Sequence, residues 1–530
     1  MIDPLSSSPP NGRLGTPATS VSSDGHFVGN GQRKPNILFI LADQVSAPLL
    51  HLHNEKSPIK TPHIDALAAK SAVFNSAYCP APLCAPSRSS LVTGQLPTRI
   101  GAWDNASPLG VDVPTYAHYL RREGYETVLA GKMHFVGEQL HGYEERLTSD
   151  IYPADLGWSV NWDDPDRRLE WYHNSSSILQ AGPCIRSNQL DFDEEVMFKS
   201  TRYLYAAARR QEEDRPFCLT VSLTHPHDPY TIHNEYWNRY EGDEIPLPEV
   251  KIAREEQDPH SKRLLKVCGL EEDLPDEAIK RARRAYFGAV SYVDDNVGKL
   301  MNVLKECGMD DNTIVIFSAD HGDMLGERGL WYKMSWYEGS ARVPLMVSYP
   351  PRFEHRVVSE NVSTLDILPT LVDLVGGQME SRLPIDGHTL VPQLQGRSGI
   401  DTVYGEYAGE GTVAPLMMIK RGPWKYVTCP VDPSQLFNLE KDPKELRNLM
   451  TVTDDAEIVQ MAGSFTKEAN ERWDMDKIRQ DVLHSQRARR LCWDALKQGR
   501  FESWDYQPKD DARERWACQL MHYDSFTKTF

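Results

Sequence analysis

The chain has 530 residues, 40% of them hydrophobic and 25% charged, a composition typical of a globular protein. Its 58 basic and 76 acidic residues give a formal net charge of −18, which argues against nucleic acid or an anionic membrane as a partner. No apolar run approaches the length of a membrane span, and the nine cysteines are scattered and odd in number, so we expect a cytoplasmic protein without a disulfide framework.

The N-terminal segment 1–33 is rich in Ser, Pro and Gly and contains no apolar core of the kind found in signal peptides. It predicts a disordered extension. From residue 34 onward, short apolar runs alternate with helical patterns. The runs typical of buried strands are 34–43, 127–132, 217–223, 313–320 and 344–350.

Helical patterns cover residues 62–74 and 291–308, and the charged segment 235–285 predicts an insertion of loops and helices. Strands that alternate with helices indicate an α/β domain, 34–400, with a mostly parallel sheet covered on both faces. A chain of this length is expected to add a smaller domain.

The sequence pattern changes near residue 400. Short strand-like segments such as "LMMIKR" and "WKYVTCP" predict a small antiparallel sheet there. A charged helical region follows at 454–500. We expect a small α+β domain at 401–490 and an aromatic tail at 491–530.

Two predicted strands end in acidic residues, at Asp43 and at Asp320 followed by His321. Carboxyl ends of parallel strands meet at one edge of a sheet, where ligands gather, so these groups can converge. Their oxygen and nitrogen atoms suit a divalent cation. The alternative is that each aspartate only caps the loop that follows.

The segment "CPAPLCAPSRSSLVTG", residues 79–94, predicts a short helix that Gly94 ends. Cys84 is expected just ahead of the helix, among unpaired N–H groups that favour anions and a thiolate. Arg88, one turn on, supplies a planar cation for oxyanions. The pattern alone also fits a packed cysteine with a surface arginine. A zinc site shared by Cys79 and Cys84 lacks a second Cys/His pair of suitable spacing.

"CAPSR" followed by "SSLVTG" resembles the signature of the formylglycine-dependent sulfatases. Further motifs of that family stand in order along residues 34–450: "GKMH" at 131–134, "HPH" at 225–227, "ADHGDMLGE" at 319–327 and "LFNLEKDPKELRNL" at 436–449. The resemblance implies an alkaline-phosphatase-like fold and a Cys84 that a maturation enzyme oxidises to Cα-formylglycine.

The resemblance also implies the reaction. One hydroxyl of the hydrated aldehyde attacks sulfur and expels the alcohol, and the second hydroxyl then releases sulfate from the sulfo-enzyme. The residues implied as metal ligands are Asp43, Cys84, Asp320 and His321, with Gln44 as a further candidate. Gln44 stands where many sulfatases have a second aspartate, and His321 where many have asparagine. Ca²⁺ is the expected ion, and Mg²⁺ and Mn²⁺ stay open.

By the same resemblance, Arg88 holds the nucleophile and Lys132 contacts sulfate. His134 is the base for breakdown of the intermediate. His225 and Lys333 bind sulfate oxygens and assist the leaving group. Outside the family pattern, each of these side chains has an ordinary alternative at the surface or in a satisfied core.

Residues 157–174, "GWSVNWDDPDRRLEWYHN", combine three tryptophans with acids, as the recognition of a quaternary ammonium requires. An ordinary packed aromatic cluster is the alternative. "PNILFILADQ", "HPHDPYTIHNEYW" and "SWDYQP" (503–508) closely resemble the choline sulfatase subgroup. The residues thereby implied in a choline pocket are Asn105, Trp158 (with Trp162 as an alternative), His173, Asn174 and Glu410.

The expected substrate is therefore choline-O-sulfate, which carries no net charge. An arylsulfatase or a phosphonate/phosphate monoester hydrolase with the same machinery is the alternative, followed by a non-catalytic protein that only binds anions. In the subgroup the C-terminal tail packs on neighbouring subunits, which implies a homo-oligomer, either a tetramer or a dimer. A tail packed on its own chain is the alternative.

Overall fold

The computed structural model describes residues 27–28, 32–137, 139–152, 155–210, 215–242 and 245–499. Most of the expected N-terminal extension, and the part of the expected tail from residue 500 onward, lie outside the described residues. Within the described ranges, no helix combines the length and apolar character needed to cross a membrane.

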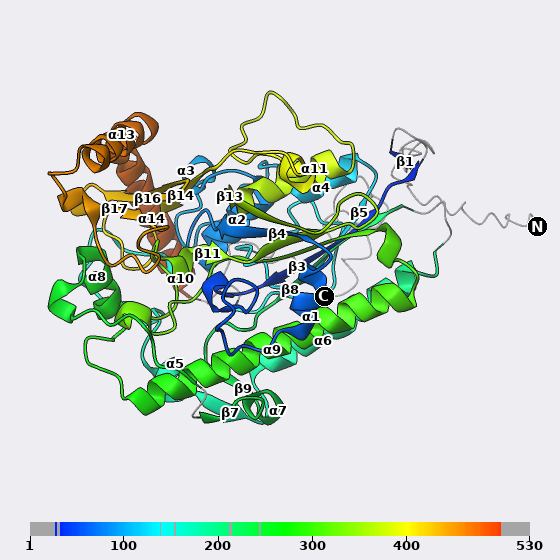
Figure 1. Ribbon diagram of the computed structural model, residues 1–530, viewed down its shortest axis with the longest axis horizontal. Coiled ribbons are helices and arrows are strands. Elements are labelled where there is room, and N and C mark those ends of the chain that lie inside the picture. The colour runs from blue at the N-terminus through cyan, green and yellow to red at the C-terminus, as the bar shows by residue number, and fades with distance from the viewer. Residues whose placement is uncertain are drawn as a thin grey trace, which may run out of the picture.

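A nine-stranded mixed sheet forms the centre of the molecule (Figure 1). The strands follow the order β11-β4-β12-β10-β3-β8-β5-β6, and β13 also pairs with β4. Only β11 and β12 run against the direction shared by the other strands of this sheet. The predicted α/β class is confirmed. The strands are β3 (Asn36–Ala42), β4 (Ala72–Tyr78), β5 (Glu126–Gly131), β6 (Glu145–Arg146), β8 (Phe217–Leu223), β10 (Thr313–Ala319), β11 (Arg342–Val343), β12 (Leu345–Ser348) and β13 (Arg356–Ser363).

Helices cover both faces of this sheet (Figure 1). One face carries α1 (Pro62–Ala68), α6 (Asn188–Ala207) and the long helix α9 (Asp276–Glu306); the other carries α2 (Cys84–Thr93), α4 (Tyr116–Arg122) and α11 (Ile367–Leu374). Every residue of β8 and β10 is buried, as expected for strands covered on both sides. Their continuous apolar sequences follow from this position.

The expected helix over 62–74 is wrong in its second half. Helix α1 ends at Ala68, and β4 begins at Ala72. Pairing with three strands, β11, β12 and β13, draws this apolar segment into the sheet. Periodicity cannot separate a short buried strand from the continuation of a helix, and here tertiary pairing decides.

A second, antiparallel sheet follows in the order β14-β15-β16-β17. Its strands are β14 (Thr402–Tyr407), β15 (Leu416–Arg421), β16 (Trp424–Cys429) and β17 (Asp432–Asn438). Helices α13 (Ala456–Arg472) and α14 (Met475–Leu496) contribute Phe465 and Val482 to a separate apolar cluster with this sheet. The small antiparallel sheet expected after residue 400 is therefore present.

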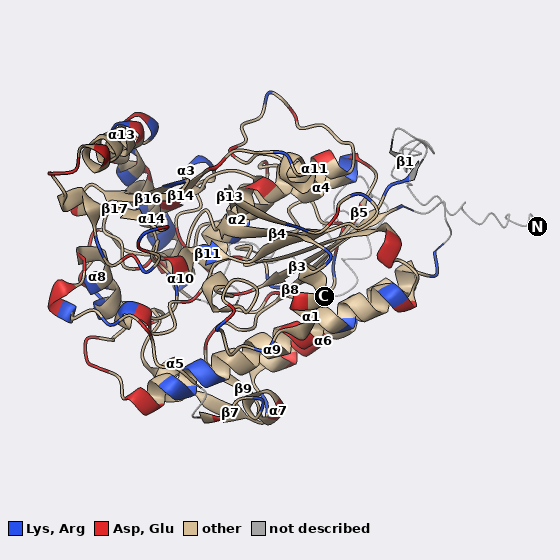
Figure 2. Ribbon diagram, viewed as in Figure 1, with Lys and Arg blue, Asp and Glu red and all other residues tan. Residues whose placement is uncertain are grey.

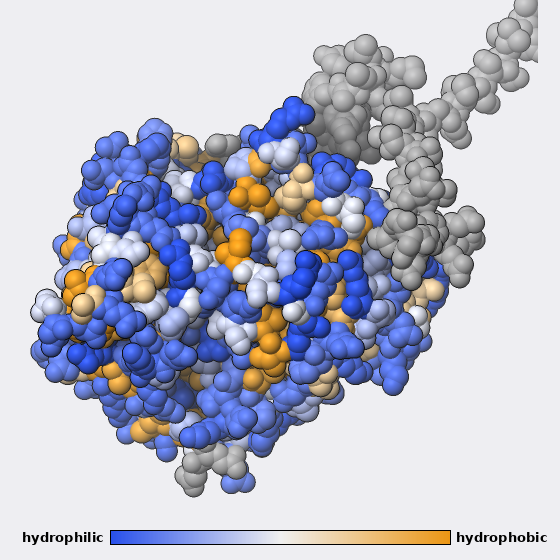
Figure 3. Space-filling model, turned by 45° about the horizontal axis from the view of Figure 1, so that its top comes forward, coloured by the Kyte–Doolittle hydropathy of each residue, from blue (hydrophilic) through white to orange (hydrophobic). Residues whose placement is uncertain are grey.

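The remaining elements are short and lie around these two sheets. They are β1 (Phe27–Val28), β2 (Gln32–Arg33), α3 (Pro97–Ile100), α5 (Ser176–Leu179), β7 (Gly182–Cys184), β9 (Thr231–His233), α7 (Asn234–Trp237), α8 (Pro259–Val267), α10 (Glu338–Ala341) and α12 (Val391–Leu394). Acidic and basic residues are both present on the surface helices (Figure 2). The face in Figure 3 is largely hydrophilic, with scattered apolar side chains.

Candidate active site

Two parallel neighbouring strands bring the strand-end acids together. In the β3–β10 pair, Ala42 lies opposite Ala319, so Asp43 and Asp320 follow at the same edge of the sheet. Both side chains are fully buried. Residues separated by more than 270 positions in sequence thus form one cluster, as the strand-end pattern predicted.

Helix α2 adds the cysteine and the arginine. Cys84 is the first residue of this helix, rather than just ahead of it as expected, because Leu83 takes the N-cap position. Gly94 ends the helix in the left-handed conformation (φ 64°), as predicted. Cys84 Sγ lies 3.2 Å from Nε2 of His321.

Arg88, one turn after Cys84 in α2, connects the two aspartates. Its guanidinium is fully buried and donates from Nε to Asp320 Oδ2 at 2.7 Å and from Nη2 to Asp43 Oδ2 at 3.1 Å. Nη1 donates to Ser222 Oγ at 2.9 Å. Such a fork holds both carboxylates in fixed orientations, so Arg88 organises the cluster and does not lie at the surface.

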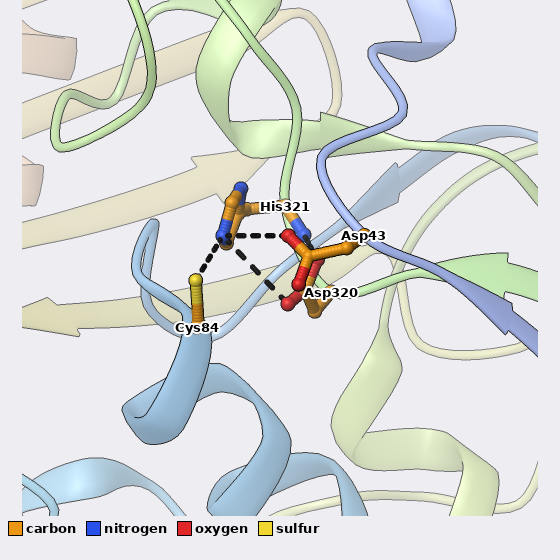
Figure 4. A group of neighbouring side chains, drawn as sticks. All are labelled: Asp43, Cys84, Asp320 and His321. Carbon is orange, nitrogen blue, oxygen red and sulfur yellow. Dashed lines mark hydrogen bonds and ion pairs between the residues drawn. The ribbon is translucent and has the colours of Figure 1, made fainter. Parts of the chain in front are cut away.

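The four groups of Asp43, Cys84, Asp320 and His321 fit a single metal ion (Figure 4). Each offers one ligand atom, and these atoms all lie within 4.8 Å of one another. Asp43 Oδ1 is buried without a hydrogen-bond partner. His321 Nδ1 lies 3.0 Å from the carbonyl of Gly322, and Nε2 faces Cys84, Asp43 and Asp320. A buried carboxylate oxygen without a hydrogen-bond partner, beside an imidazole nitrogen, suits a divalent cation.

Nearby cations keep this cluster ionised. Burial alone would raise the pKa of Asp43, but Lys132, His227 and Arg88 outweigh burial and hold that pKa well below its usual range. Lys132 Nζ lies 2.5 Å from Asp43 Oδ2. Burial and Asp43 raise the pKa of the Cys84 thiol, and Lys132, Lys333 and His227 lower it. The lowering is larger, so the net shift of this pKa is downward. The pocket thus favours negative charge at residue 84.

Gln44, the further candidate ligand, has both ends of its amide engaged elsewhere. Its Nε2 donates to Asp323 at 2.7 Å, and its Oε1 accepts from Lys333 Nζ at 2.7 Å. In this arrangement the Gln44 amide orients Lys333. The hydrogen bonds that satisfy a buried amide decide its direction.

His134 carries a ring with no hydrogen-bond partner at either nitrogen, although the residue is buried. Burial, with Lys132 and Arg88 adding to it, holds the pKa of His134 well below its usual range. Its ring is therefore neutral and able to accept a proton, as a general base requires. The edge of the ring meets Trp158 at 5.9 Å between centroids.

The two histidines of "HPH" occupy different environments. His225 points to Asp193, with Nδ1 2.7 Å from Oδ2, and packs against Tyr292 of α9. His227 instead lies in the site, with Nε2 2.9 Å from Lys333 Nζ. Side chains two apart take opposite roles here because the chain leaves β8 in a turn rather than as an extended strand. Of the two histidines, His227 is the one in contact with Lys333.

The aromatic stretch 157–174 folds so that Trp158 stacks on Trp171, with ring planes 7° apart and centroids separated by 6.1 Å. Trp158 is half-buried and faces His134. Trp162, the alternative to Trp158, is buried in the apolar cluster of the second sheet and donates to Thr412 Oγ1 at 3.2 Å. The structure therefore favours Trp158.

His173 and Glu410 form the other part of this region. Nδ1 of His173 lies 3.3 Å from Glu410 Oε2, and Nε2 lies 3.2 Å from Lys333 Nζ. Burial and Lys333 lower the pKa of His173, but Asp228 and Glu410 outweigh them and raise it to about 9. Glu410 is 1% exposed, and its second oxygen, Oε1, has no partner. A buried carboxylate oxygen without a partner is costly and points to a cationic ligand.

The two asparagines expected in the choline pocket are placed differently. Asn174 is exposed, and its Oδ1 accepts from the backbone N–H of Ser176 at the start of α5. That local cap takes the side chain away from the pocket. Asn105 is buried, and its Oδ1 accepts from the N–H of Ala85 at 3.0 Å, directly beside Cys84.

Three residues of the site were missed by the sequence prediction. His227 stands in the "HPH" motif and Trp171 in the aromatic stretch, so each has a signal in the sequence. Tyr152 lies under Lys132, with Nζ 5.8 Å from the ring centroid, and no motif marks it. The first two could have been weighed as alternatives; Tyr152 could not, because it lies in an irregular loop.

Comparison with known proteins agrees with this geometry. The family model described as "Sulfatase" matches residues 35–377. The chain belongs to the sulfatase family. Residues 326–471 match the model "N-sulphoglucosamine sulphohydrolase, C-terminal", and residues 480–528 match "Choline sulfatase enzyme C terminal".

Two relatives place the chain within the family. It is 45% identical to the choline-sulfatase of Rhizobium meliloti (strain 1021) over 507 residues, which cover 94% of this chain and 98% of that enzyme. It is 29% identical to an arylsulfatase of Clostridium perfringens, over 79% of this chain and 90% of the relative. The phosphonate monoester hydrolase of Agrobacterium radiobacter shares the fold, with a TM-score of 0.67 and 24% identity over 85% of this chain and 96% of that one.

Proposed function

We propose that this sulfuric ester hydrolase converts choline-O-sulfate and water to choline and sulfate. The observation that carries the proposal is the unpartnered, buried Oε1 of Glu410, on a sulfatase site. The other oxygen of Glu410 faces His173, which follows Trp171 of the stacked tryptophan pair by two residues. A quaternary ammonium cannot donate a hydrogen bond and is bound by charge and aromatic faces. The 45% identity to a choline-sulfatase supports the same substrate.

Residue 84 is proposed to act after oxidation of Cys84 to formylglycine, whose hydrate supplies one hydroxyl for attack on sulfur and a second for the release of sulfate. Asp43, residue 84, Asp320 and His321 would hold a divalent cation, with Ca²⁺ expected and Mg²⁺ and Mn²⁺ as alternatives. Once bound, that ion supplies positive charge that stabilises the deprotonated hydroxyl and the developing charge on sulfate.

The remaining roles fall to residues of the chain itself. Arg88 keeps the two aspartates and the start of α2 in place through its buried fork. Lys132, His227 and Lys333 surround Cys84 with positive or donor groups for the sulfate oxygens. His134, neutral and without a partner, is placed to accept the proton when the intermediate breaks down.

The leaving alcohol is proposed to lie against Trp158, with its ammonium near Glu410. Choline-O-sulfate carries an anionic sulfate and a cationic ammonium. Its sulfate can bind the cationic side of the site while its ammonium binds the anionic Glu410. We further propose that the protein is a cytoplasmic homo-oligomer and that a maturation enzyme oxidises Cys84. The proposed domain limits lie at residues 33, 400 and 490.

Hydrolysis assays test the substrate directly. Choline-O-sulfate should be hydrolysed with a kcat/KM well above that for nitrophenyl sulfate and a phenyl phosphonate ester, with choline and sulfate released in equal amounts. Preference for the aryl sulfate or the phosphonate would contradict the choline assignment.

Peptide mass spectrometry across residue 84 separates an enzyme from a protein that only binds anions, because formylglycine has lost the sulfur.

A further inference from the structure

The loop that carries Trp158 lies against the C-terminal helix α14. The short helical turn Leu156–Trp158 packs on α14, and Gly157 lies under the indole of Trp493. A Cβ atom at position 157 would lie 2.6 Å from Cε2 of that indole. The loop backbone and the helix are therefore in direct contact.

Side chains of α14 also satisfy the backbone of this loop. Gln486 Oε1 accepts from the N–H of Trp162 at 2.9 Å, and Arg490 donates to the carbonyl of Val160 at 3.2 Å. Buried backbone groups need such partners, so these bonds fix the path of the loop beyond Trp158.

Arg489 makes the buried ionic connection between α14 and this region. Its side chain is 7% exposed, it binds both oxygens of the fully buried Asp104, and its Nη2 lies 3.1 Å from Oδ2. The same Oδ2 accepts from the N–H of Val160 at 3.2 Å. One carboxylate therefore joins helix α14 to the Trp158 loop, and the planar guanidinium determines its orientation.

The contact continues toward the nucleophile. Asn105 follows Asp104 directly, and its side chain accepts from Ala85 next to Cys84. A single short segment, Asp104–Asn105, thus contacts both the start of the cysteine helix and the loop of the aromatic wall. Its position depends on the cation that Arg489 supplies from α14.

We propose that Arg489 is a positioning residue that sets the distance between the Trp158 wall of the alcohol pocket and Cys84. The inference rests on the proposed function, because it assumes that the alcohol lies against Trp158. It assigns a task to the helical part of the segment that matches the choline sulfatase C-terminal model. Arg489 acts through Asp104 and does not touch the substrate.

The test is Arg489→Lys, which keeps the positive charge but loses the two-pronged contact with Asp104. The KM for choline-O-sulfate and the Kd for choline should each rise on the order of tenfold, because small displacements of a positioning contact are costly. The value of kcat at saturation should stay within about threefold, since the groups around Cys84 are intact. Calorimetry with choline and steady-state kinetics give both quantities.

The control is Lys477→Gln on the same helix, whose partner Asp481 lies on the exposed surface of α14; all constants should equal those of the unaltered protein. A merely structural role for Arg489 would lower kcat through loss of folded enzyme and leave KM unchanged, and that result would overturn the inference. If Arg489→Lys does not fold, a double variant is used, in which Asp104→Asn and Arg489→Gln remove both charges. The KM of this double variant for choline-O-sulfate is then measured in the same way.

Failure of the proposed function is recognised first, in the unaltered protein. If that protein neither hydrolyses choline-O-sulfate nor binds choline, the proposed function is wrong and the inference falls with it. If it does both, and the Arg489 variants keep its KM and Kd, only the inference is wrong.

Discussion

The sulfate side of the site is built from the ends of regular elements, whereas the alcohol side is built from loops. Asp43 and Asp320 end parallel strands, and Arg88 lies within a helix, all with fully buried side chains. Trp158 and His173 lie in an irregular segment and are only partly buried. The first group is fixed by backbone geometry and the second by side-chain packing. Substitutions should therefore affect reaction and recognition separately.

The largest effect is expected at residue 84. Cys84→Ser should lower kcat by a factor on the order of 10⁴ or more, because an ordinary hydroxyl cannot supply the second hydroxyl of the hydrate. Cys79→Ala is the matched control in the same segment. Burial raises the pKa of the Cys79 thiol, and no role in the reaction is assigned to it. Activity of Cys84→Ser close to that of the control would contradict a formylglycine nucleophile.

The two histidines of "HPH" provide the next comparison. His227→Gln should lower kcat/KM about 100-fold with little change in Tm, because a donor to the sulfate is weakened. His225→Gln should chiefly lower the free energy of unfolding, by about 1–3 kcal/mol, since Asp193 loses the buried imidazole and keeps only the two backbone N–H donors. Kinetics and thermal melts measure both. The reverse assignment of effects would return the sulfate-binding role to His225.

Glu410→Gln tests the alcohol side on its own. For choline-O-sulfate, KM should rise about tenfold, equal to about 1.4 kcal/mol, because the ammonium loses its charge partner. The isosteric sulfate ester in which an uncharged carbon replaces the ammonium nitrogen should be affected much less. Asn174→Ala is the control, since its side chain caps α5 at the surface. Equal losses on both esters would argue against Glu410 as the ammonium partner.

The smallest expected effect is the change of choline affinity with pH. His173 faces Lys333, Asp228, Glu410 and His227, and its pKa is raised to about 9. Above this pH the ring loses a positive charge beside Glu410, so choline should bind a few-fold more tightly as pH rises through 9. Titration calorimetry from pH 7 to 10 measures the change. His173→Asn should remove it, and weaker choline binding at high pH would contradict it.

The convergence of the strand-end acids and the helix that begins at Cys84 could be predicted from the sequence because these residues belong to periodic elements. Buried apolar runs located β3 and β10, and their parallel pairing follows from the alternation with helices. The motif around Cys84 then gave Arg88 and Gly94 their positions on α2. The fold class followed from the same alternation.

The alcohol side could not be predicted as closely, because loop paths depend on contacts that no local pattern encodes. The Asn174 side chain bonds to the N–H of Ser176, although its neighbour His173 reaches Glu410. On the sulfate side, the turn after β8 likewise directs His225 to Asp193 and His227 to Lys333. The end of α1 at Ala68 was missed for a related reason, since pairing of β4 with three strands is a long-range property. Nor does any motif connect Arg489 with Asp104.

A crystal structure of the mature protein with choline and a metal ion tests the central claim most directly. The account predicts formylglycine at position 84, one ion held by Asp43, Asp320 and His321, and the ammonium between the Trp158 face and Glu410. An unmodified Cys84 in active protein, or choline bound away from Trp158 and Glu410, would contradict it.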